Sequence, residues 1–553
     1  MAQRRSRSRS RSAFAALGAT ALVGAMTWGG STAAWAVEPL EFADTVTVEA
    51  IMQRLGALQD IADAPGNGGN RAAGSPGYEA SGQYVESVLA EAGYATSRQV
   101  FDVATQTIAS QSVSIGGETL TPEQAIPMTY TPGTPSITFD AILPTVITGC
   151  TADDWAGTDA TDRIAVVSRG VCSFTEKSLA AAAAGAPALI VYNSEPGPLN
   201  GTFGEVTDGT VPTFGIEADR GAALVASIGQ APVSISVALE QSVETVSTFN
   251  VIAETSTGNP DNVVMLGSHL DSVPEGPGIN DNGSGSATLL EVAVQLAQQG
   301  ELNNKVRFAW WGAEELGLVG STHYVDDLAV NDPDELERIA TYLNFDMVGS
   351  PNYIIGTYDA DESSVPADVE IPEGSVETED VFENYFASIG QPFVGTSFDG
   401  RSDYQAFIDN GIPASGLFTG ADDVKTAEEV ALFGGIAGET HDQNYHQAGD
   451  DLANINQEAL GIMSRAIAFA TASLANDTVL INGVAAPSPG TAVPVAPAPG
   501  DPASAAAPKP ALAATGSSDA VALVGASSLA LLIGVTMIGL RARRRYASTA
   551  PKS

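Results

Sequence analysis

Two strand-like apolar runs enclose one helix-like run in the stretch VVMLGSHLDSVPEGPGINDNGSGSATLLEVAVQLAQQGELNNKVRFAWWGAEE, residues 263–315. VVMLGS and VRFAWW are continuous apolar runs, which are typical of strands buried on both faces of a sheet. Between them, SATLLEVAVQLAQQG places apolar residues at helical spacing after a glycine-rich loop. The order of strand, loop, helix and strand predicts an α/β fold whose site lies at the strand ends.

The same alternation continues on both sides of this stretch. FNVIAE (249–254) and YLNFDMVG (342–349) predict further strands, whereas residues 48–62, 77–94 and 452–475 predict helices. Residues 107–245 differ, because they are rich in threonine, serine and valine with frequent turn signals, which favours short strands. We therefore expect one α/β domain formed by residues 37–106 and 246–482, with a β-rich domain inserted between its two parts.

The first 36 residues are expected to be a signal peptide that is removed. MAQRRSRSRSRS is basic, an alanine-rich apolar stretch follows, and the triplet Ala34-Trp35-Ala36 has the small-x-small pattern of a cleavage site. A basic interaction arm is the alternative, but these three parts stand in the order of an export signal.

The other end predicts attachment to the cell surface. A proline- and alanine-rich spacer (483–511) precedes LAATG (512–516), an uncharged run from Ala520 to Leu540, and RARRR (541–545). The uncharged run is long enough to span a bilayer, with the arginines on the cytoplasmic side. The order resembles the sorting signal of actinobacterial sortases, which implies a secreted protein joined to the peptidoglycan of a Gram-positive bacterium. A permanent membrane helix is the alternative.

Composition excludes some partners and predicts one covalent link. The formal net charge is −42, and such an acidic surface repels nucleic acid and favours cation binding. Cys150 and Cys172 are the only cysteines, and an exported chain without a third thiol is expected to join them in a structural disulfide. A catalytic thiol is disfavoured because no histidine lies near either cysteine in the sequence.

Histidines and carboxylates gather where strands end or helices begin. These residues are His269, Asp281, Glu314, Glu315, Asp346 and His446. In His269-Leu270-Asp271, alternate residues of a strand end point the same way, so Asp271 is expected to orient the imidazole ring. Such a mixture of ligands suits zinc, and a shared carboxylate suits a pair of ions. His323 and His441 belong to no such motif and are expected on the surface or on a helix.

The motifs GSHLDS, GINDNGSGSA, FAWWGAEELGLVGS, YLNFDMVGS and YHQAGDDL together resemble the secreted di-zinc aminopeptidases of metallopeptidase family 28. This resemblance implies a zinc-exopeptidase domain with a mixed central sheet flanked by helices. It places His269 and Asp346 on one zinc ion, Glu315 and His446 on the other, and Asp281 between them. It also implies that Glu314 is the general base, that Tyr445 supplies a hydroxyl on the oxyanion side, and that Arg401 contacts the substrate.

Two details of the resemblance concern single positions. Relatives often have Ser-Asp-His where this chain has Ser402-Asp403-Tyr404, which puts contacts around the metal ligands in doubt but removes no ligand. A strained or cis peptide bond between Asp281 and Asn282 is also implied. The many aspartates additionally leave room for a calcium ion.

The middle region has a resemblance of its own. Cys150, RGVCSFTEKSLAAAAAGAPALIVYN and VPTFGI resemble a protease-associated (PA) domain, which is non-catalytic. Shielding the cleft, binding substrate and a purely structural role all remain open for it.

The expected function is removal of N-terminal residues from peptides with a free amino end. Two metals can polarise the peptide carbonyl and activate water, while an unligated glutamate moves the proton. Acidic groups such as Glu314 and Asp346 would hold the substrate amine. A carboxypeptidase on the same scaffold and a non-catalytic peptide-binding wall protein are the alternatives, and the paired ligand set disfavours a one-metal glutaminyl cyclase.

Overall fold

A computed structural model describes residues 37–485 except 195, 196, 205 and 368. The expected signal peptide, the LAATG motif, the apolar run, the basic tail and nearly all of the spacer therefore lie outside the described residues. None of the helices in the described part of the chain is long and apolar enough to cross a bilayer.

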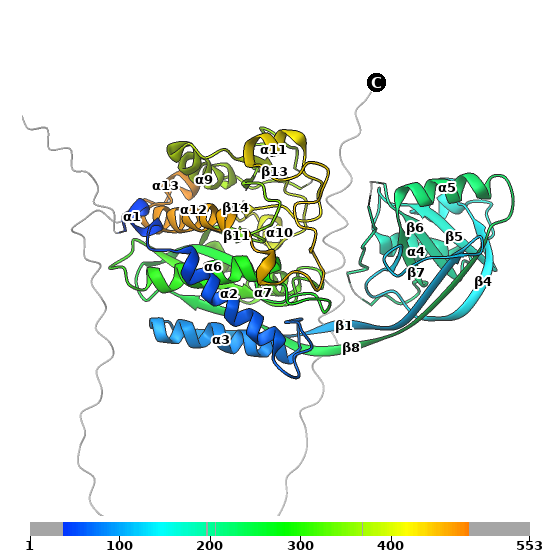
Figure 1. Ribbon diagram of the computed structural model, residues 1–553, viewed down its shortest axis with the longest axis horizontal. Coiled ribbons are helices and arrows are strands. Elements are labelled where there is room, and N and C mark those ends of the chain that lie inside the picture. Colours follow the sequence, from blue (N-terminus) through cyan, green and yellow to red (C-terminus); the bar gives the residue numbers. More distant parts are fainter. Residues whose placement is uncertain (1–36, 195–196, 205, 368, 486–553) are drawn as a thin grey trace, which may run out of the picture. The chain divides into compact units, whose positions relative to one another are not determined.

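One group of helices and strands flanks the inserted region in sequence (Figure 1). Its helices are α1 (Pro39–Ala43), α2 (Val48–Asp63), α3 (Pro76–Ala92), α6 (Gly285–Leu296), α7 (Val319–Asn331), α8 (Pro333–Glu337), α9 (Ser375–Ile389), α10 (Gln405–Asp409), α11 (Ala427–Phe433), α12 (Gln457–Asn476) and α13 (Val479–Asn482). Its strands are β1 (Thr96–Ile115), β8 (Ser234–Glu254), β9 (Asn259–His269), β10 (Asn304–Trp311), β11 (Ile339–Phe345), β12 (Gly356–Tyr358), β13 (Val394–Thr396) and β14 (Ala414–Phe418).

These strands form a mixed sheet in the order β13-β12-β14-β11-β9-β10-β8, with β1 paired to β8. The four central strands β14, β11, β9 and β10 are mutually parallel, whereas β8 runs antiparallel to β10 and β12 antiparallel to β14. The expected α/β fold with a mixed central sheet is confirmed. Parallel strands bring their carboxyl ends to one edge, and the site is built there.

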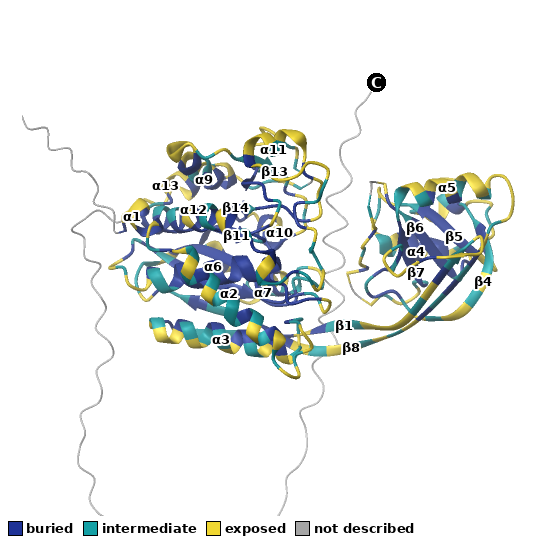
Figure 2. Ribbon diagram, viewed as in Figure 1, coloured by how far each residue is buried: buried dark blue, intermediate teal, exposed yellow. Residues whose placement is uncertain are grey.

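The central strands are buried on both faces, as their continuous apolar runs predict. Along β9, Leu266 packs in the apolar cluster that includes α2, α3, α6 and α12, whereas Met265 packs in the cluster that includes α7 and α10. Trp310 and Trp311 divide between the same two clusters, because successive strand residues point to opposite faces. Figure 2 shows the resulting buried layer between the helices.

Local signals set the ends of the N-terminal helices. The Thr47 hydroxyl accepts a hydrogen bond from the amide of Ala50 and caps α2, and Ser75 does the same for α3 through the amide of Tyr78. Helix α3 begins with Pro76, whose missing amide is not needed in a first helical turn. It ends at Gly93, whose φ of 95° is readily adopted only without a side chain.

Strands β1 and β8 continue into the inserted region and pair with each other from Thr96–Ala253 to Ile115–Ile235. The expected domain boundaries at 106/107 and 245/246 therefore fall inside continuous strands rather than in linkers. The other elements of this region are β2 (Glu118–Thr119), β3 (Ala125–Pro127), β4 (Thr134–Ile142), β5 (Arg163–Ser168), α4 (Phe174–Ala183), β6 (Ala188–Tyr192), β7 (Thr213–Ile216) and α5 (Ala218–Ile228). The inserted region is β-rich, as predicted.

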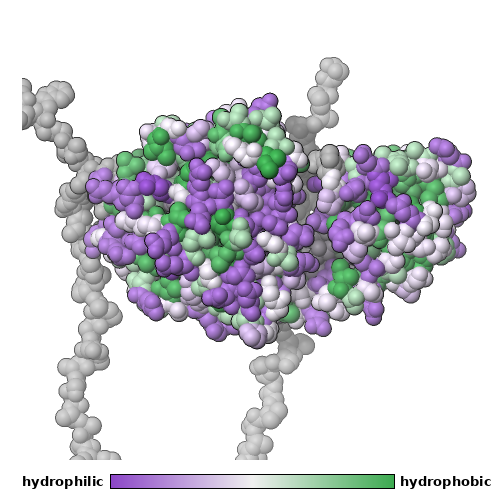
Figure 3. Space-filling model, in the orientation of Figure 1, coloured by the Kyte–Doolittle hydropathy of each residue, from purple (hydrophilic) through white to green (hydrophobic). Residues whose placement is uncertain are grey.

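The visible surface of the described residues is largely polar (Figure 3). Hydrophilic residues cover most of the face in Figure 3, and the hydrophobic areas on it are small and separate. Single exposed apolar residues of this kind are normal for soluble domains.

Candidate active site

The predicted ligands stand at the carboxyl ends of three adjacent parallel strands. His269 is the last residue of β9, Glu314 and Glu315 follow the end of β10, and Asp346 directly follows β11. Asp281 comes from the irregular turn before α6, where its peptide bond to Asn282 is cis, as the resemblance implies. His446 comes from the long loop between α11 and α12.

His269 is the centre of one half of this cluster. Its Nε2 atom lies 3.3 Å from Oδ1 of Asp281 and 3.3 Å from Oδ1 of Asp346. Oε2 of Glu314 is farther away, at 3.9 Å. Only 1 % of the His269 side chain is exposed, so the ring itself is almost completely shielded from solvent.

His446 is the centre of the other half. Its Nε2 atom lies 3.3 Å from Oδ2 of Asp281 and 3.0 Å from Oε2 of Glu315. Asp281 thus turns one carboxylate oxygen toward each histidine, which is the arrangement of a carboxylate shared by two ions.

Two oxygen atoms of this cluster are buried and accept no well-aligned hydrogen bond from the described residues, although one of them is in contact with the His269 ring. They are Oδ1 of Asp346 and Oε1 of Glu315. A buried carboxylate oxygen that no protein group satisfies is unfavourable unless a cation binds it. Histidine nitrogen and carboxylate oxygen are the donors that zinc prefers, so the residues fit a zinc centre.

The charges in the cluster are poorly balanced. Burial raises the pKa of Glu314 well above its usual range, with Asp346 adding to the shift, and burial raises the pKa of Glu315 to about 7. Burial opposes protonation of His269, but Asp346 and Glu314 raise its pKa well above its usual range. Four carboxylates thus lie around only two imidazoles. The resulting excess of negative charge favours the binding of cations.

Asp271 supports the turn that carries the two glutamates. Its carboxylate accepts hydrogen bonds from the amide of Glu314 at 3.1 Å and from the amide of Glu315 at 3.4 Å. Nδ1 of His269 lies 3.7 Å from Oδ1 of Asp271 but 3.2 Å from the backbone oxygen of the same residue. Asp271 therefore approaches the ring most closely with its backbone oxygen, whereas its carboxylate, which was predicted to orient the ring, lies farther away and fixes the glutamate turn.

Two further residues that the sequence analysis missed hold the Asp281 turn. Asp450 accepts hydrogen bonds from the amides of Asn280 and Asp281 at 2.8 and 2.9 Å. Arg71 is fully buried and donates to the backbone oxygens of Leu270, Pro277 and Gly278. One guanidinium thus joins the segment after His269 to the segment before Asp281.

Tyr445 and Arg401 lie beside each other at the rim. Nη2 of Arg401 is 3.5 Å from the Tyr445 hydroxyl, and both terminal nitrogens of Arg401 donate to Oδ1 of Asp422 at 3.2 Å. The Tyr445 ring stacks on the ring of His446 with a centroid distance of 3.9 Å. The predicted catalytic hydroxyl is thereby placed next to one predicted ligand.

The segment Ser402-Asp403-Tyr404 contacts the cluster of predicted ligands through Ser402. The Ser402 hydroxyl donates to Oδ2 of Asp346 at 2.6 Å. Tyr404 points elsewhere, since its hydroxyl donates to Asp399 at 2.9 Å. Asp403 is 1 % exposed, and burial raises its pKa to about 7. Tyr404 therefore displaces no predicted ligand.

A cavity of about 440 Å³ opens beside the cluster. Six of the predicted site residues line it: Asp281, Glu314, Glu315, Asp346, Arg401 and Tyr445. Met347, Tyr358 and Phe418, at or next to the ends of β11, β12 and β14, line it as well. His441 also lines it and is only 3 % exposed. The expectation that His441 lies on the surface or on a helix is wrong, because its loop has no periodicity that reveals a buried side chain. His323 lies on α7, as expected.

A second acidic cluster, which adjoins the cavity wall at Tyr358 and Val365, consists of Asp359, Asp361 and Glu379. Asp359 already accepts hydrogen bonds from the amides of residues 363–365, and Glu379 accepts one from the amide of Ala360. These oxygens therefore have donors within the chain, and calcium stays a prediction from the sequence.

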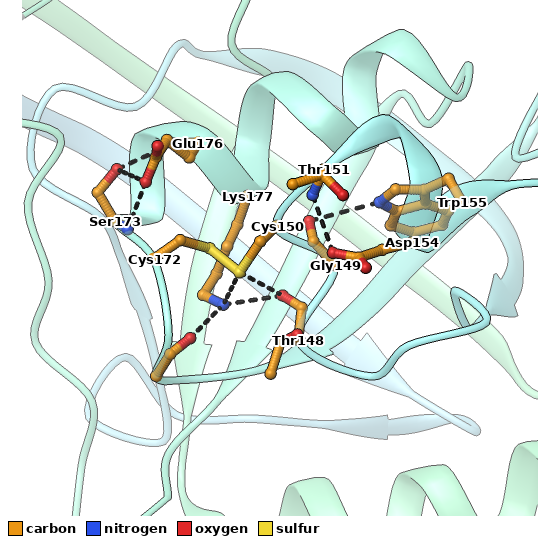
Figure 4. The surroundings of a disulfide bond; sticks show 11 residues. Thr148, Gly149, Cys150, Thr151, Asp154, Trp155, Cys172, Ser173, Glu176 and Lys177 are labelled. Atoms are coloured by element: carbon orange, nitrogen blue, oxygen red, sulfur yellow. Dashed lines mark hydrogen bonds between the residues drawn. A yellow bond between two sulfur atoms is a disulfide. The ribbon is translucent and has the colours of Figure 1, made fainter. Parts of the chain in front are cut away.

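The two cysteines lie in the inserted region and are bonded, with an S–S distance of 2.06 Å (Figure 4). Lys177 is fully buried beneath the bond, and its Nζ donates to the backbone oxygens of Thr148 and Gly170 at 2.8 Å each. The disulfide thus joins the same two loops whose backbone oxygens accept hydrogen bonds from Lys177.

Comparison with known proteins agrees with this architecture. Residues 250–471 match the profile of peptidase family M28, and residues 141–224 match that of the PA domain. An aminopeptidase of Pseudomonas aeruginosa PAO1 is 43 % identical over 463 residues, which cover 80 % of this chain and 84 % of the relative. A probable lipoprotein aminopeptidase, LpqL, of Mycobacterium tuberculosis is 43 % identical over 451 residues, or 79 % and 87 % of the two chains.

Solved structures show the same fold. An aminopeptidase from Aneurinibacillus sp. strain AM-1 superposes with a TM-score of 0.64 at 27 % identity, over 78 % of this chain and 95 % of that one. A zinc aminopeptidase from Bacillus subtilis superposes with a TM-score of 0.55 at 23 % identity, again over 78 % and 95 %.

Proposed function

The chain belongs to peptidase family M28 and carries a PA domain, and we propose that it is a zinc-dependent aminopeptidase acting on peptides with a free N-terminus. One observation carries the proposal. Asp281 turns its two carboxylate oxygens toward His269 and His446, with Glu314 close by but farther from His269 than Asp281 and Asp346 are.

The predicted ligands divide into two sets around Asp281. His269 and Asp346 would hold one zinc ion, and His446 and Glu315 would hold the other. The buried oxygens of Asp346 and Glu315 that accept no hydrogen bond support this division, since a cation in each set would bind one of them. Bound zinc supplies a Lewis acid for the peptide carbonyl and lowers the pKa of a coordinated water.

Glu314 is assigned the proton transfers. Its side chain is largely buried and lies 3.9 Å from His269, so it can stay unligated while facing the same space. Burial favours the protonated form of a carboxylate, which makes Glu314 a stronger base than an exposed glutamate. It would accept a proton from the attacking water and donate it to the departing amine.

Tyr445 and Arg401 are assigned to the substrate side of the cavity. The Tyr445 hydroxyl can donate a hydrogen bond to the oxygen of the scissile carbonyl as negative charge develops on it. Arg401 holds Asp422 and lies next to that hydroxyl, so it can contact the bound peptide and position Tyr445.

The charge of the cavity favours an aminopeptidase over a carboxypeptidase. A carboxypeptidase needs a cation for the C-terminal carboxylate of its substrate. Among the described residues that line the cavity, Arg401 is the one arginine or lysine, and Asp422 already pairs with it. Acidic groups such as Glu314 and Asp346 can hold a substrate amine instead.

A panel of matched peptides tests the assignment. The zinc-loaded protein should release the first residue of a free peptide, and N-acetylation of the same peptide should abolish the release. A chelator should stop the reaction and zinc should restore it. Equal cleavage of free and acetylated peptides, or release from the carboxyl end, would contradict the proposal.

Export and wall attachment are proposed from the sequence alone, because residues 1–36 and 486–553 lie outside the described part. Muralytic enzyme should release a protein that ends at Thr515, and a Thr515→Ala variant should lose this covalent attachment. Recovery of the protein only with detergent would favour a permanent membrane helix instead.

A further inference from the structure

The wall of the cavity beyond the predicted metal ligands combines an apolar base with charged groups. The base is formed by Met347, Ile354 and Tyr358, which are 2, 4 and 5 % exposed. The acidic residues of this part of the wall are Asp399, Asp422, Asp423 and Glu429. A side chain that enters here therefore finds both apolar surface and carboxylates in the same cavity wall.

His441 adds a buried polar group to the same wall. Its side chain is 4 % exposed, and neither ring nitrogen has a hydrogen-bond partner among the described residues. Nε2 lies 3.5 Å from Oε2 of Glu429, which is beyond the range of a good hydrogen bond. Burial lowers the pKa of His441, so the ring is neutral at pH 7 and offers one acceptor nitrogen.

The backbone fixes this ring in place. A Cβ atom on Gly420, whose φ is +91°, would lie 2.4 Å from Cγ of His441, so only glycine lets the ring pack here. The amide of His441 donates to the backbone oxygen of Asp423 at 3.0 Å. The unpartnered nitrogens therefore belong to an ordered part of the wall.

The cations near this wall are already engaged. Arg401 pairs with Asp422, and the Lys425 ammonium group donates to the backbone oxygens of Asn352 and Tyr353. Glu429 accepts hydrogen bonds from the amide and hydroxyl of Thr426. Among the described residues its one ion-pair contact is with the His441 ring, and Lys425 acts on it only from a greater distance. The wall thus carries uncompensated negative charge.

We propose that this cavity receives the side chain of the N-terminal residue and selects lysine or arginine over uncharged residues of the same length. The apolar base contacts the methylene groups, Glu429 balances the terminal charge, and the free nitrogen of His441 accepts one of its hydrogen bonds. This inference rests on the proposed aminopeptidase function, because it assigns the substrate class of that same site.

Lysine p-nitroanilide and norleucine p-nitroanilide test it, because the two differ mainly in the terminal ammonium group. The zinc-loaded wild type should show a kcat/KM for lysine at least about fivefold above that for norleucine. Glu429→Gln should lower this ratio about tenfold, because glutamine keeps the cap of α11 but removes the charge.

Two further variants complete the experiment. Glu428→Gln changes the preceding, exposed residue of α11, which does not line the cavity, and should leave the ratio unchanged. His441→Phe keeps a flat ring without the acceptor and should lower the ratio in the same direction as Glu429→Gln.

Equal or faster cleavage of norleucine by the wild type would overturn the inference, even if Glu429→Gln failed to fold. So would a Glu429→Gln ratio equal to that of Glu428→Gln. If the wild type cleaves neither anilide, both the aminopeptidase function and this inference are wrong. If it prefers norleucine, only the inference about the side chain is wrong.

Discussion

At the scale of single residues, the sequence predicted a set of ligands and one supporting residue, Asp271, but not the supports Arg71 and Asp450. His269, Asp346 and the two glutamates follow apolar strands, and parallel strands bring such ends together. Arg71 lies far from them in the sequence, between two helices, and nothing around it shows that its side chain turns inward. Its role depends on three backbone oxygens, which leave no trace in a sequence.

Replacement of Arg71 by lysine should weaken zinc binding. Lysine keeps the charge but cannot hold three carbonyls on two segments, so the Asp281 turn and the segment after His269 would lose their common anchor. We expect zinc affinity to fall by roughly 10- to 100-fold, as for other residues that orient metal ligands. Competition with a chelator of known affinity measures this without an activity assay.

Arg54→Lys is the matched control, because Arg54 pairs with Glu291 away from the site. Zinc affinities of Arg71→Lys and Arg54→Lys that both equal the wild-type value would show that Arg71 does not position the ligands.

At the scale of elements, strands were predicted more closely than the loops between them. The sequence placed the strands that became β9, β10 and β11, because buried parallel strands are continuous apolar runs. The loop between α11 and α12 has no such pattern, and it supplies the buried His441 as well as Tyr445 and His446. Motif resemblance found the last two, and only packing against Gly420 reveals the first.

Helix α9 supplies a pH-dependent contact to the loop after β12. Glu379 on α9 is 3 % exposed and accepts a hydrogen bond from the amide of Ala360 at 2.8 Å. Burial, with Glu383 and Asp359 nearby, raises the pKa of Glu379 to about 8. Between the unfolded value near 4.5 and this value, the folded protein binds a proton that the unfolded chain releases. The contribution of Glu379 to stability is therefore fully present below pH 4.5 and is lost as pH rises toward 8.

Glu379→Gln should remove this dependence. Compared with the wild type, the variant should gain roughly 2–4 kcal/mol in free energy of unfolding between pH 4.5 and pH 8. Urea unfolding of both proteins at several pH values, at constant zinc, measures the difference. Parallel stability curves would show that Glu379 titrates normally.

At the scale of the whole molecule, an α/β peptidase domain is interrupted by a PA domain through one pair of long strands. Composition predicted a separate β-rich domain but not the long pair of strands that leads into it. The reason is that β1 and β8 are polar and exposed for part of their length, so their sequences resemble those of loops. The acidic charge of the chain is consistent with a protein that binds cations and carries acidic groups around its substrate cavity.

The central claim is that two adjacent glutamates divide the work, with Glu315 on zinc and Glu314 moving protons. The most direct test measures zinc content and kcat in Glu314→Gln and Glu315→Gln, which apply the same substitution to neighbouring residues. We predict that Glu314→Gln keeps two zinc ions per chain and loses about 10²- to 10⁴-fold in kcat, whereas Glu315→Gln loses zinc. A Glu314→Gln protein with near wild-type kcat, or one that has lost its zinc, would contradict the account.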